Sequence, residues 1–93
     1  MRTIEETNQF KRDFRRVLKG QYRKTAEVDF FQILELLVND EPMPLKYRDH
    51  ALTGDYRDCR DCHIAPDLVL IYQKPDLETL ILIRFGSHSE LGF

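Results

Sequence analysis

The 93-residue chain is 42% hydrophobic and 32% charged, with a formal net charge of −2, and its length fits one folded domain, residues 1–93, and no second. Its longest apolar runs, 68–72 and 80–83, fall far below the roughly 18 residues that a membrane span needs. The residues before position 9 lack the apolar stretch of a signal peptide. We therefore expect a cytoplasmic protein with no membrane partner. The acidic net charge also argues against a protein that coats nucleic acid by bulk electrostatics.

The first half of the chain predicts a short strand at the amino end, followed by two amphipathic helices. In the first helix, Thr7 or Asn8 caps the amino end and Gly20 ends the helix. The second helix has its N-cap at Thr25 and ends before Pro42. Apolar residues recur at helical spacing in both: Phe10, Phe14, Val17 and Leu18 in the first, and Phe30, Ile33, Leu34 and Leu37 in the second.

The second half is rich in β-branched, leucine and aromatic side chains and is divided by turn-forming residues. It predicts three strands, at about 56–63, 67–73 and 78–85. Their connections are too short for a parallel crossover, so neighbouring strands are antiparallel. The apolar stripes of the helices need a surface to cover, and the strands supply it. The sequence therefore predicts an α+β fold, in which two N-terminal helices pack on one face of a mainly antiparallel sheet of four to five strands.

The segment 59–63, Cys-Arg-Asp-Cys-His, has the pattern of a c-type haem attachment site and of half a zinc or redox site. On a strand, however, side chains three positions apart point to opposite faces, so Cys59 and Cys62 do not bind one metal ion together. Covalent haem attachment also takes place after a protein is exported, and we expect no export signal in this chain. We therefore favour incidental cysteines, with no metal and no cofactor. The same alternation places four residues on one side of the strand: Arg57, Cys59, Asp61 and His63.

The residues that can carry chemistry lie near predicted strand ends in the second half: His50, His63, Asp67, Arg84, Ser87 and His88. Antiparallel neighbours bring positions 63 and 67 together across a short connection, whereas spacing alone leaves open whether 50, 84 and 88 join them. If they gather, the set holds groups that move protons near neutral pH and a guanidinium that binds phosphate through two hydrogen bonds. The alternative for any one histidine is an ordinary surface side chain.

Three segments resemble a known family: Tyr-Arg-Asp-His-Ala-Leu-Thr-Gly at 47–54, the run from Tyr56 to Tyr72 that contains Cys-His-Ile-Ala-Pro-Asp, and Arg-Phe-Gly-Ser-His-Ser-Glu-Leu at 84–91. In these segments the chain is similar to the YafQ branch of the RelE toxin superfamily. The resemblance implies a RelE-like domain and a ribosome-dependent mRNA endonuclease, the toxin of a type II toxin–antitoxin system. It also implies a cognate antitoxin that holds the toxin inactive in a hetero-oligomer.

The resemblance assigns catalytic roles to His50, His63, Asp67, Arg84 and His88. We expect metal-free cleavage of mRNA, in which the 2′-hydroxyl of the RNA attacks the neighbouring phosphate. His88 is then the general acid, and Arg84 stabilises the transition-state phosphate. Either His50 or Asp67 is the general base, and His63 orients the reacting groups or contacts phosphate.

A basic strip runs through the first predicted helix, with seven lysines and arginines between Lys11 and Lys24 and one acid, Asp13. A solvated helix face is one interpretation. The other is contact with ribosomal RNA or with an acidic segment of the antitoxin, and the candidates for RNA contact are Arg12, Arg15, Arg16 and Phe93.

An alternative to the nuclease is a degenerate relative that binds its antitoxin or RNA without cutting. It is favoured by Leu68, where the family often has tryptophan, and by Gly92, which shifts the terminal aromatic residue to Phe93.

Overall fold

Thr7 joins the first strand to the first helix. Its hydroxyl accepts a hydrogen bond from the backbone N–H of Phe10 at 2.9 Å and donates one to the carbonyl of Ile83 at 2.8 Å. Thr7 therefore caps the helix, as predicted, and also ties its amino end to the sheet.

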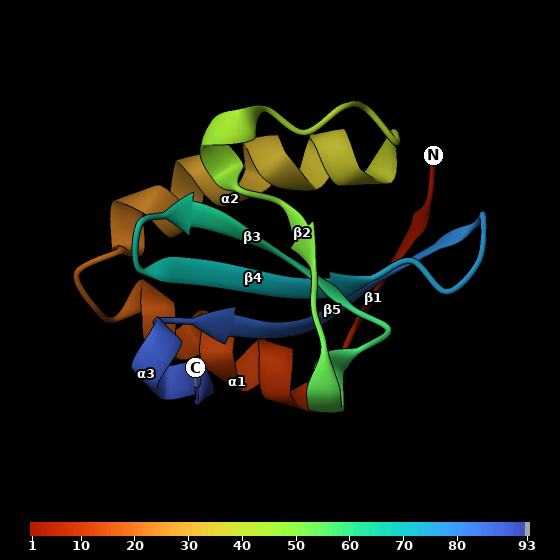
Figure 1. Cartoon of the computed structure of the whole chain (residues 1–93). Coiled ribbons are helices and arrows are strands. Elements are labelled where there is room, and N and C mark those ends of the chain that lie inside the picture. The colour runs from red at the N-terminus through yellow and green to blue at the C-terminus, as the bar shows by residue number, and fades with distance from the viewer. Residues whose placement is uncertain (93) are drawn as a thin grey trace.

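The computed structural model describes residues 1–92, which form a five-stranded sheet and three α-helices (Figure 1). In chain order the elements are β1 (Thr3–Glu6), α1 (Asn8–Leu18), α2 (Arg23–Val38), η1 (Leu45–Tyr47), β2 (His50–Ala51), η2 (Gly54–Tyr56), β3 (Arg60–Ala65), β4 (Leu68–Gln73), β5 (Thr79–Gly86) and α3 (His88–Leu91), where η marks a 3₁₀ turn.

The strands follow the order β1-β5-β4-β3-β2. β1 pairs with β5 in parallel, and the other three pairs are antiparallel. The parallel pair is made possible by α1 and α2, which supply the long crossover that such a pair requires. The prediction of an α+β fold with two N-terminal helices on a mainly antiparallel sheet is confirmed.

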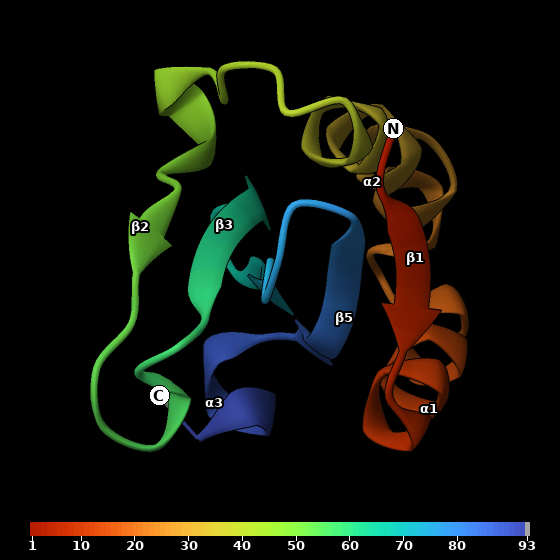
Figure 2. The same cartoon turned by 90° about the vertical axis from the view of Figure 1, so that its right-hand side faces the viewer.

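The two faces of the sheet carry separate apolar clusters. On one face, α1 and α2 pack against the strands, and the ring centroids of Phe10, Phe14, Phe30 and Phe85 lie 5.1 to 6.0 Å apart. On the other face, Leu91 of α3 packs with Cys59, Val69 and Ile71. Figure 2 shows α1 and α2 on one side of the molecule and β2 and α3 on the other. Within the described residues, short elements alone cover the second face, which leaves room for a site.

Several boundaries differ from the prediction. The second helix begins at Arg23 after Tyr22, without a side-chain cap, and its first turn is supported by an ion pair between Arg23 and Glu27 at 2.9 Å. Thr25 is therefore inside the helix. The strand expected from 56 begins only at Arg60, because residues 54–56 form η2.

The carboxyl end of the described chain forms α3, which the sequence did not predict. Ser87 and Glu90 form a reciprocal capping box at its start, and Gly92 ends it in the left-handed conformation at φ 84°. Gly92 thus has a structural role as a helix terminator. Within residues 1–92, none of the helices combines the length and apolar character needed to cross a membrane.

Candidate active site

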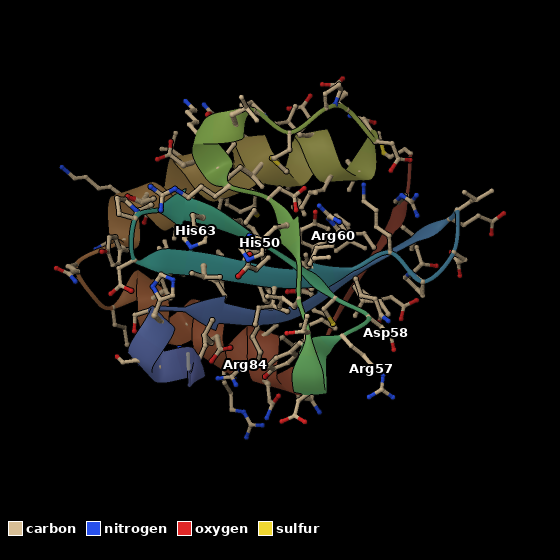
Figure 3. All side chains as sticks on the ribbon, viewed as in Figure 1. His50, Arg57, Asp58, Arg60, His63 and Arg84 are labelled. Atoms are coloured by element: carbon tan, nitrogen blue, oxygen red, sulfur yellow. The ribbon has the colours of Figure 1, made fainter. Side chains whose placement is uncertain are left out.

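Three imidazoles from three elements meet on the sheet face opposite α1 and α2. His50 begins β2, His63 lies in β3 and His88 begins α3. The ring centroids of His63 and His88 are 5.2 Å apart, and those of His50 and His63 are 6.2 Å apart. Figure 3 shows His50 and His63 side by side, near the place where β2 pairs with β3. The fold therefore brings together the three histidines whose convergence the spacing alone left open.

Asp67, in the turn between β3 and β4, holds His88. Its Oδ1 accepts hydrogen bonds from the backbone N–H of His88 at 3.0 Å and from Nδ1 of the same residue at 2.6 Å. These two hydrogen bonds lower the pKa of the Asp67 carboxyl. Because an ionised carboxylate only accepts, Nδ1 of His88 carries a proton, and Nε2 is the atom that faces the other imidazoles.

His63 and His88 share a contact between their Nε2 atoms, which lie 3.2 Å apart. One proton fits between two such nitrogens, so only one of the rings donates there. Burial lowers the pKa of His63, and the neighbouring imidazoles of His88 and His50 lower it further, although Asp61 opposes them. The lowered pKa of His63 favours the neutral form of this ring, which lies beside the His88 that Asp67 holds.

His50 is fixed through Nδ1. That atom lies 2.8 Å from the backbone carbonyl of Arg48 and 3.0 Å from Oδ1 of Asp61. Arg48 adopts the left-handed conformation at φ 50°, an uncommon choice for a residue other than glycine. Both neighbours of Nδ1 are acceptors, so Nδ1 carries the proton in the neutral ring, and Nε2 has the lone pair. The ring is 55% exposed and open to a substrate.

Arg84 is placed elsewhere. Its Nε donates to Oδ2 of Asp13 at 2.7 Å and its Nη2 to Oδ1 at 3.3 Å, and these hydrogen bonds raise its pKa. In Figure 3, Arg84 lies towards α1. Within residues 1–92, its contacts are with Asp13 and Tyr56, not with the imidazoles. The structure thus gathers His50, His63, Asp67 and His88, and leaves Arg84 at the side.

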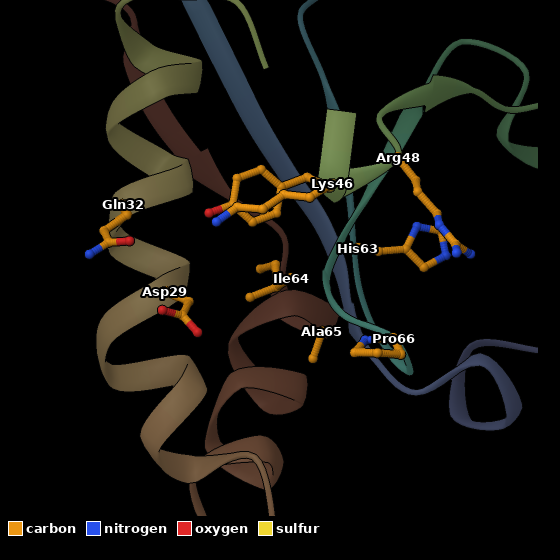
Figure 4. Close-up of a pocket in the computed structure, with 9 residues that line it drawn as sticks. Asp29, Gln32, Lys46, Arg48, His63, Ile64, Ala65 and Pro66 are labelled. Atoms are coloured by element: carbon orange, nitrogen blue, oxygen red, sulfur yellow. The ribbon is translucent and has the colours of Figure 1, made fainter. Parts of the chain in front are cut away.

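An open pocket of about 270 Å³ adjoins His63 between η1, β3 and α2 (Figure 4). Its lining includes Arg48 and His63 on one side and Asp29 and Gln32 from α2 on the other, and the side chain of Lys46 extends from η1 towards α2 (Figure 4). The exposed side chain of Arg48 places positive charge next to His63, where a phosphate group can be held.

The family model for the bacterial toxin of type II toxin–antitoxin systems, YafQ, matches residues 2–92. The chain belongs to the YafQ family. The mRNA interferase toxin YafQ of Escherichia coli strain K12 is 35% identical over 91 residues, which are 97% of this chain and 95% of that relative.

Solved structures of toxins agree with this fold. A copper-bound mutant toxin from Helicobacter pylori gives a TM-score of 0.88 at 35% identity and covers 98% of this chain and 99% of that one. The E. coli DinJ-YafQ complex gives 0.81 at 32% identity and covers 98% of each.

The basic strip of α1 in this chain has two kinds of arginine. Arg12 and Arg15 are exposed on α1. Arg16 instead contacts Asp13 at 3.0 Å and Glu90 at 2.9 Å, and donates to the carbonyl of Phe85 at 3.1 Å. Arg16 therefore ties α1 to β5 and α3, whereas Arg12 and Arg15 are the arginines proposed for RNA contact that keep exposed side chains on α1. The fourth predicted RNA contact, Phe93, lies outside the described residues.

Two sequence features are explained by the faces of the sheet. Cys62 is buried in the cluster against the helices and Cys59 in the cluster on the opposite face, so the two thiols lie in different layers. In residues 1–92 no group of three histidine, cysteine or acidic side chains is placed to hold a metal ion. Leu68 is 1% exposed in the helix-facing cluster, so it does not face the imidazoles.

Three residues that position the side chains of the site or hold Arg84 were not selected from the sequence. Asp61 shares its strand face with His63, as the alternation had placed it, but no role was given to it. Asp13 lies three and four positions from Phe10 and Val17, on the apolar side of α1, which is the signal of a buried acid. Arg48 gave no signal, because its role depends on its left-handed backbone.

Proposed function

We propose that this YafQ-family protein is an mRNA interferase that cuts ribosome-bound mRNA in the cytoplasm. The observation that supports it best is the set of side chains around His63: a carboxylate-held His88 and an open Nε2 on His50, within reach of one substrate group. The E. coli relative is named an mRNA interferase, and its structure with DinJ is a toxin–antitoxin complex. A cognate antitoxin that binds and inhibits this chain in a hetero-oligomer is part of the proposal.

In the proposed reaction, Nε2 of His50 takes the proton of the 2′-hydroxyl, and the 2′-oxygen attacks the adjacent phosphorus. The bond from phosphorus to the 5′-oxygen breaks, and Nε2 of His88 donates its proton to that oxygen. The products are a 2′,3′-cyclic phosphate and a 5′-hydroxyl. Asp67 is less suited to be the base, because its Oδ1 accepts two hydrogen bonds from His88. His63 orients His88 through the contact between their Nε2 atoms.

Phosphate stabilisation needs a cation. Arg84 remains proposed for this role through the N–H groups that Asp13 does not occupy. Arg48 is added to it, because its exposed side chain lies in the pocket beside His63 (Figure 4). Both are guanidinium groups, which match the shape and charge of a phosphate.

The test of this function is the chemistry of the cut. Purified protein is incubated with ribosomes programmed with a defined mRNA, and the ends of the products are analysed. We expect a cyclic or 3′-phosphate upstream and a 5′-hydroxyl downstream. An mRNA with a single 2′-deoxy nucleotide at the cut position should not be cleaved there, because it lacks the nucleophile.

The matched control carries the 2′-deoxy substitution one nucleotide downstream, where it leaves the nucleophile in place and cleavage should persist. Cleavage of the first substrate, or a downstream product with a 5′-phosphate, would indicate attack by water and contradict the mechanism. If a folded protein that still binds its antitoxin cleaves no mRNA, the result would instead indicate the degenerate relative that binds its antitoxin or RNA without cutting.

The exposed arginines of α1 are proposed to dock on ribosomal RNA. Arg12→Glu or Arg15→Glu should weaken ribosome binding and reduce its salt dependence by about 0.7 to 0.9 in the slope of log affinity against log salt, as expected for one lost phosphate contact. The affinity is measured at several salt concentrations. Arg57→Glu, a charge reversal at an exposed position after η2, is the control. Equal slopes for all three variants and the parent would indicate that the basic strip is a solvated helix face that does not contact ribosomal RNA.

A further inference from the structure

Asp61 is a buried carboxylate directly beneath the imidazoles. It is 4% exposed in β3, and its register partner across the ladder is His50 of β2. Its ion-pair partner is the Nδ1 of His50 at 3.0 Å. Within residues 1–92, no lysine or arginine forms an ion pair with it, and Oδ1 has no hydrogen bond of good geometry.

A buried carboxylate is costly unless a positive charge lies close to it. Burial raises the pKa of Asp61, and the charged groups that act against this are His50 from β2, His63 from its own strand and His88 from α3. Asp49, from the loop before β2, is a second negative charge and acts in the same direction as burial. The positive charge that Asp61 can use is therefore that of a protonated imidazole.

Asp61 also acts on the proton of His50. The Arg48 carbonyl and Asp61 place two acceptors at Nδ1, 2.8 and 3.0 Å away, and neither can donate when Asp61 is ionised. A neutral His50 is then protonated on Nδ1 and has its lone pair on Nε2. This is the tautomer that a general base requires, with the lone pair on the exposed side of the ring.

We propose that Asp61 is a positioning residue for mRNA cleavage, which keeps His50 protonated on Nδ1 and stabilises the imidazolium that His50 becomes. When Nε2 accepts the proton of the 2′-hydroxyl, the new positive charge lies beside the buried carboxylate, and it disappears when the proton leaves for solvent. Asp61 does not touch the RNA. This inference rests on the proposed function, because it assigns a partner to the base of that reaction.

The experiment compares the parent with Asp61→Asn, an isosteric variant without the charge whose amide can donate to Nδ1. The nitrogen chemical shifts of the His50 ring, measured by NMR on RNA-free protein, should change from the Nδ1–H form towards the Nε2–H form. The acidic limb of the single-turnover cleavage profile should also move to lower pH by about one unit, since an opposite charge within about 4–6 Å shifts a proton equilibrium by that order. Asp55→Asn, which removes an exposed charge in η2, should leave both readouts unchanged.

Unchanged ring shifts and an unchanged pH profile in Asp61→Asn would overturn the proposal, as would lost activity that simply follows lost stability. If Asp61→Asn does not fold, the test uses Asp61→Glu, which keeps a carboxylate at this position. Both Asp61→Glu and the parent must then show the Nδ1–H form of His50. An Nε2–H form in the parent would overturn the inference. Failure of the proposed function is seen separately, as a parent that does not cut mRNA. The ring shifts test Asp61 in either case.

Discussion

His88→Ala is expected to reduce the single-turnover rate of mRNA cleavage by about 10²- to 10⁴-fold, the usual contribution of one positioned proton donor. His88 is the imidazole that Asp67 holds at 2.6 Å, with Nε2 directed at His63. Alanine removes the proton donor for the 5′-oxygen, and it also leaves Nε2 of His63 without its partner. The rate is measured with ribosomes that carry one defined mRNA, at saturating toxin, so that weak binding does not contribute.

The fold should persist in this variant, because His88 lies on the surface at the start of α3 and the helix is anchored by Leu91 and the capping box. Thermal unfolding and binding of the cognate antitoxin check this. Ser89→Ala, an exposed change in the same helix, should cleave as the parent does. If His88→Ala loses the fold or antitoxin binding together with cleavage, His88 is a structural residue and the assignment of the general acid is wrong.

The sequence predicted the parts of this fold that have a periodic pattern. The apolar spacing of α1 and α2 and the dense apolar runs of β4 and β5 placed these elements within a few residues. β2 and α3 were missed because they contain two and four residues, too few to establish a period. The start of β3 was wrong because η2 continues the turn at Gly54, which takes φ 69°.

The residues of the site also fall into two groups, those that a sequence pattern placed close together and those that it did not. His63 and Asp67 were predicted to be close because a tight connection joins their strands. The approach of His50 and His88 depends on the pairing of the short strand β2 with β3 and on the helix α3, which no sequence pattern predicted. Only the family resemblance indicated that these residues lie together. Arg84 separated from the group because the buried Asp13 attracts it, and that pairing joins residues 71 positions apart, beyond the reach of any local pattern.

Asp13→Ala is expected to lower the free energy of unfolding by about 3 kcal/mol, the low end of the cost of removing one partner from a buried ion pair. Asp13 is 3% exposed and accepts from Arg84 at 2.7 Å and from the backbone N–H of Phe85 at 3.0 Å, with Arg16 at 3.0 Å. Alanine leaves the Phe85 N–H buried without a partner and Arg84 without its counter-charge. Urea unfolding measures the change, and Lys11→Ala on the exposed face of α1 should stay within about 0.5 kcal/mol of the parent.

The pH dependence of this variant provides the second test. Burial acts to raise the pKa of Asp13, but the hydrogen bonds from Arg84 and Phe85 and the charges of Arg84 and Arg16 lower it overall from its ordinary value of 3.8. A group with a lowered pKa in the folded state stabilises the fold above its unfolded value, and this contribution is lost as the pH falls below about 3.8. The parent should therefore lose more stability than Asp13→Ala between neutral pH and the acid range. Parallel curves for the two proteins would mean that Asp13 is not the ionised anchor of Arg84, and that the sheet alone keeps this guanidinium away from the imidazoles.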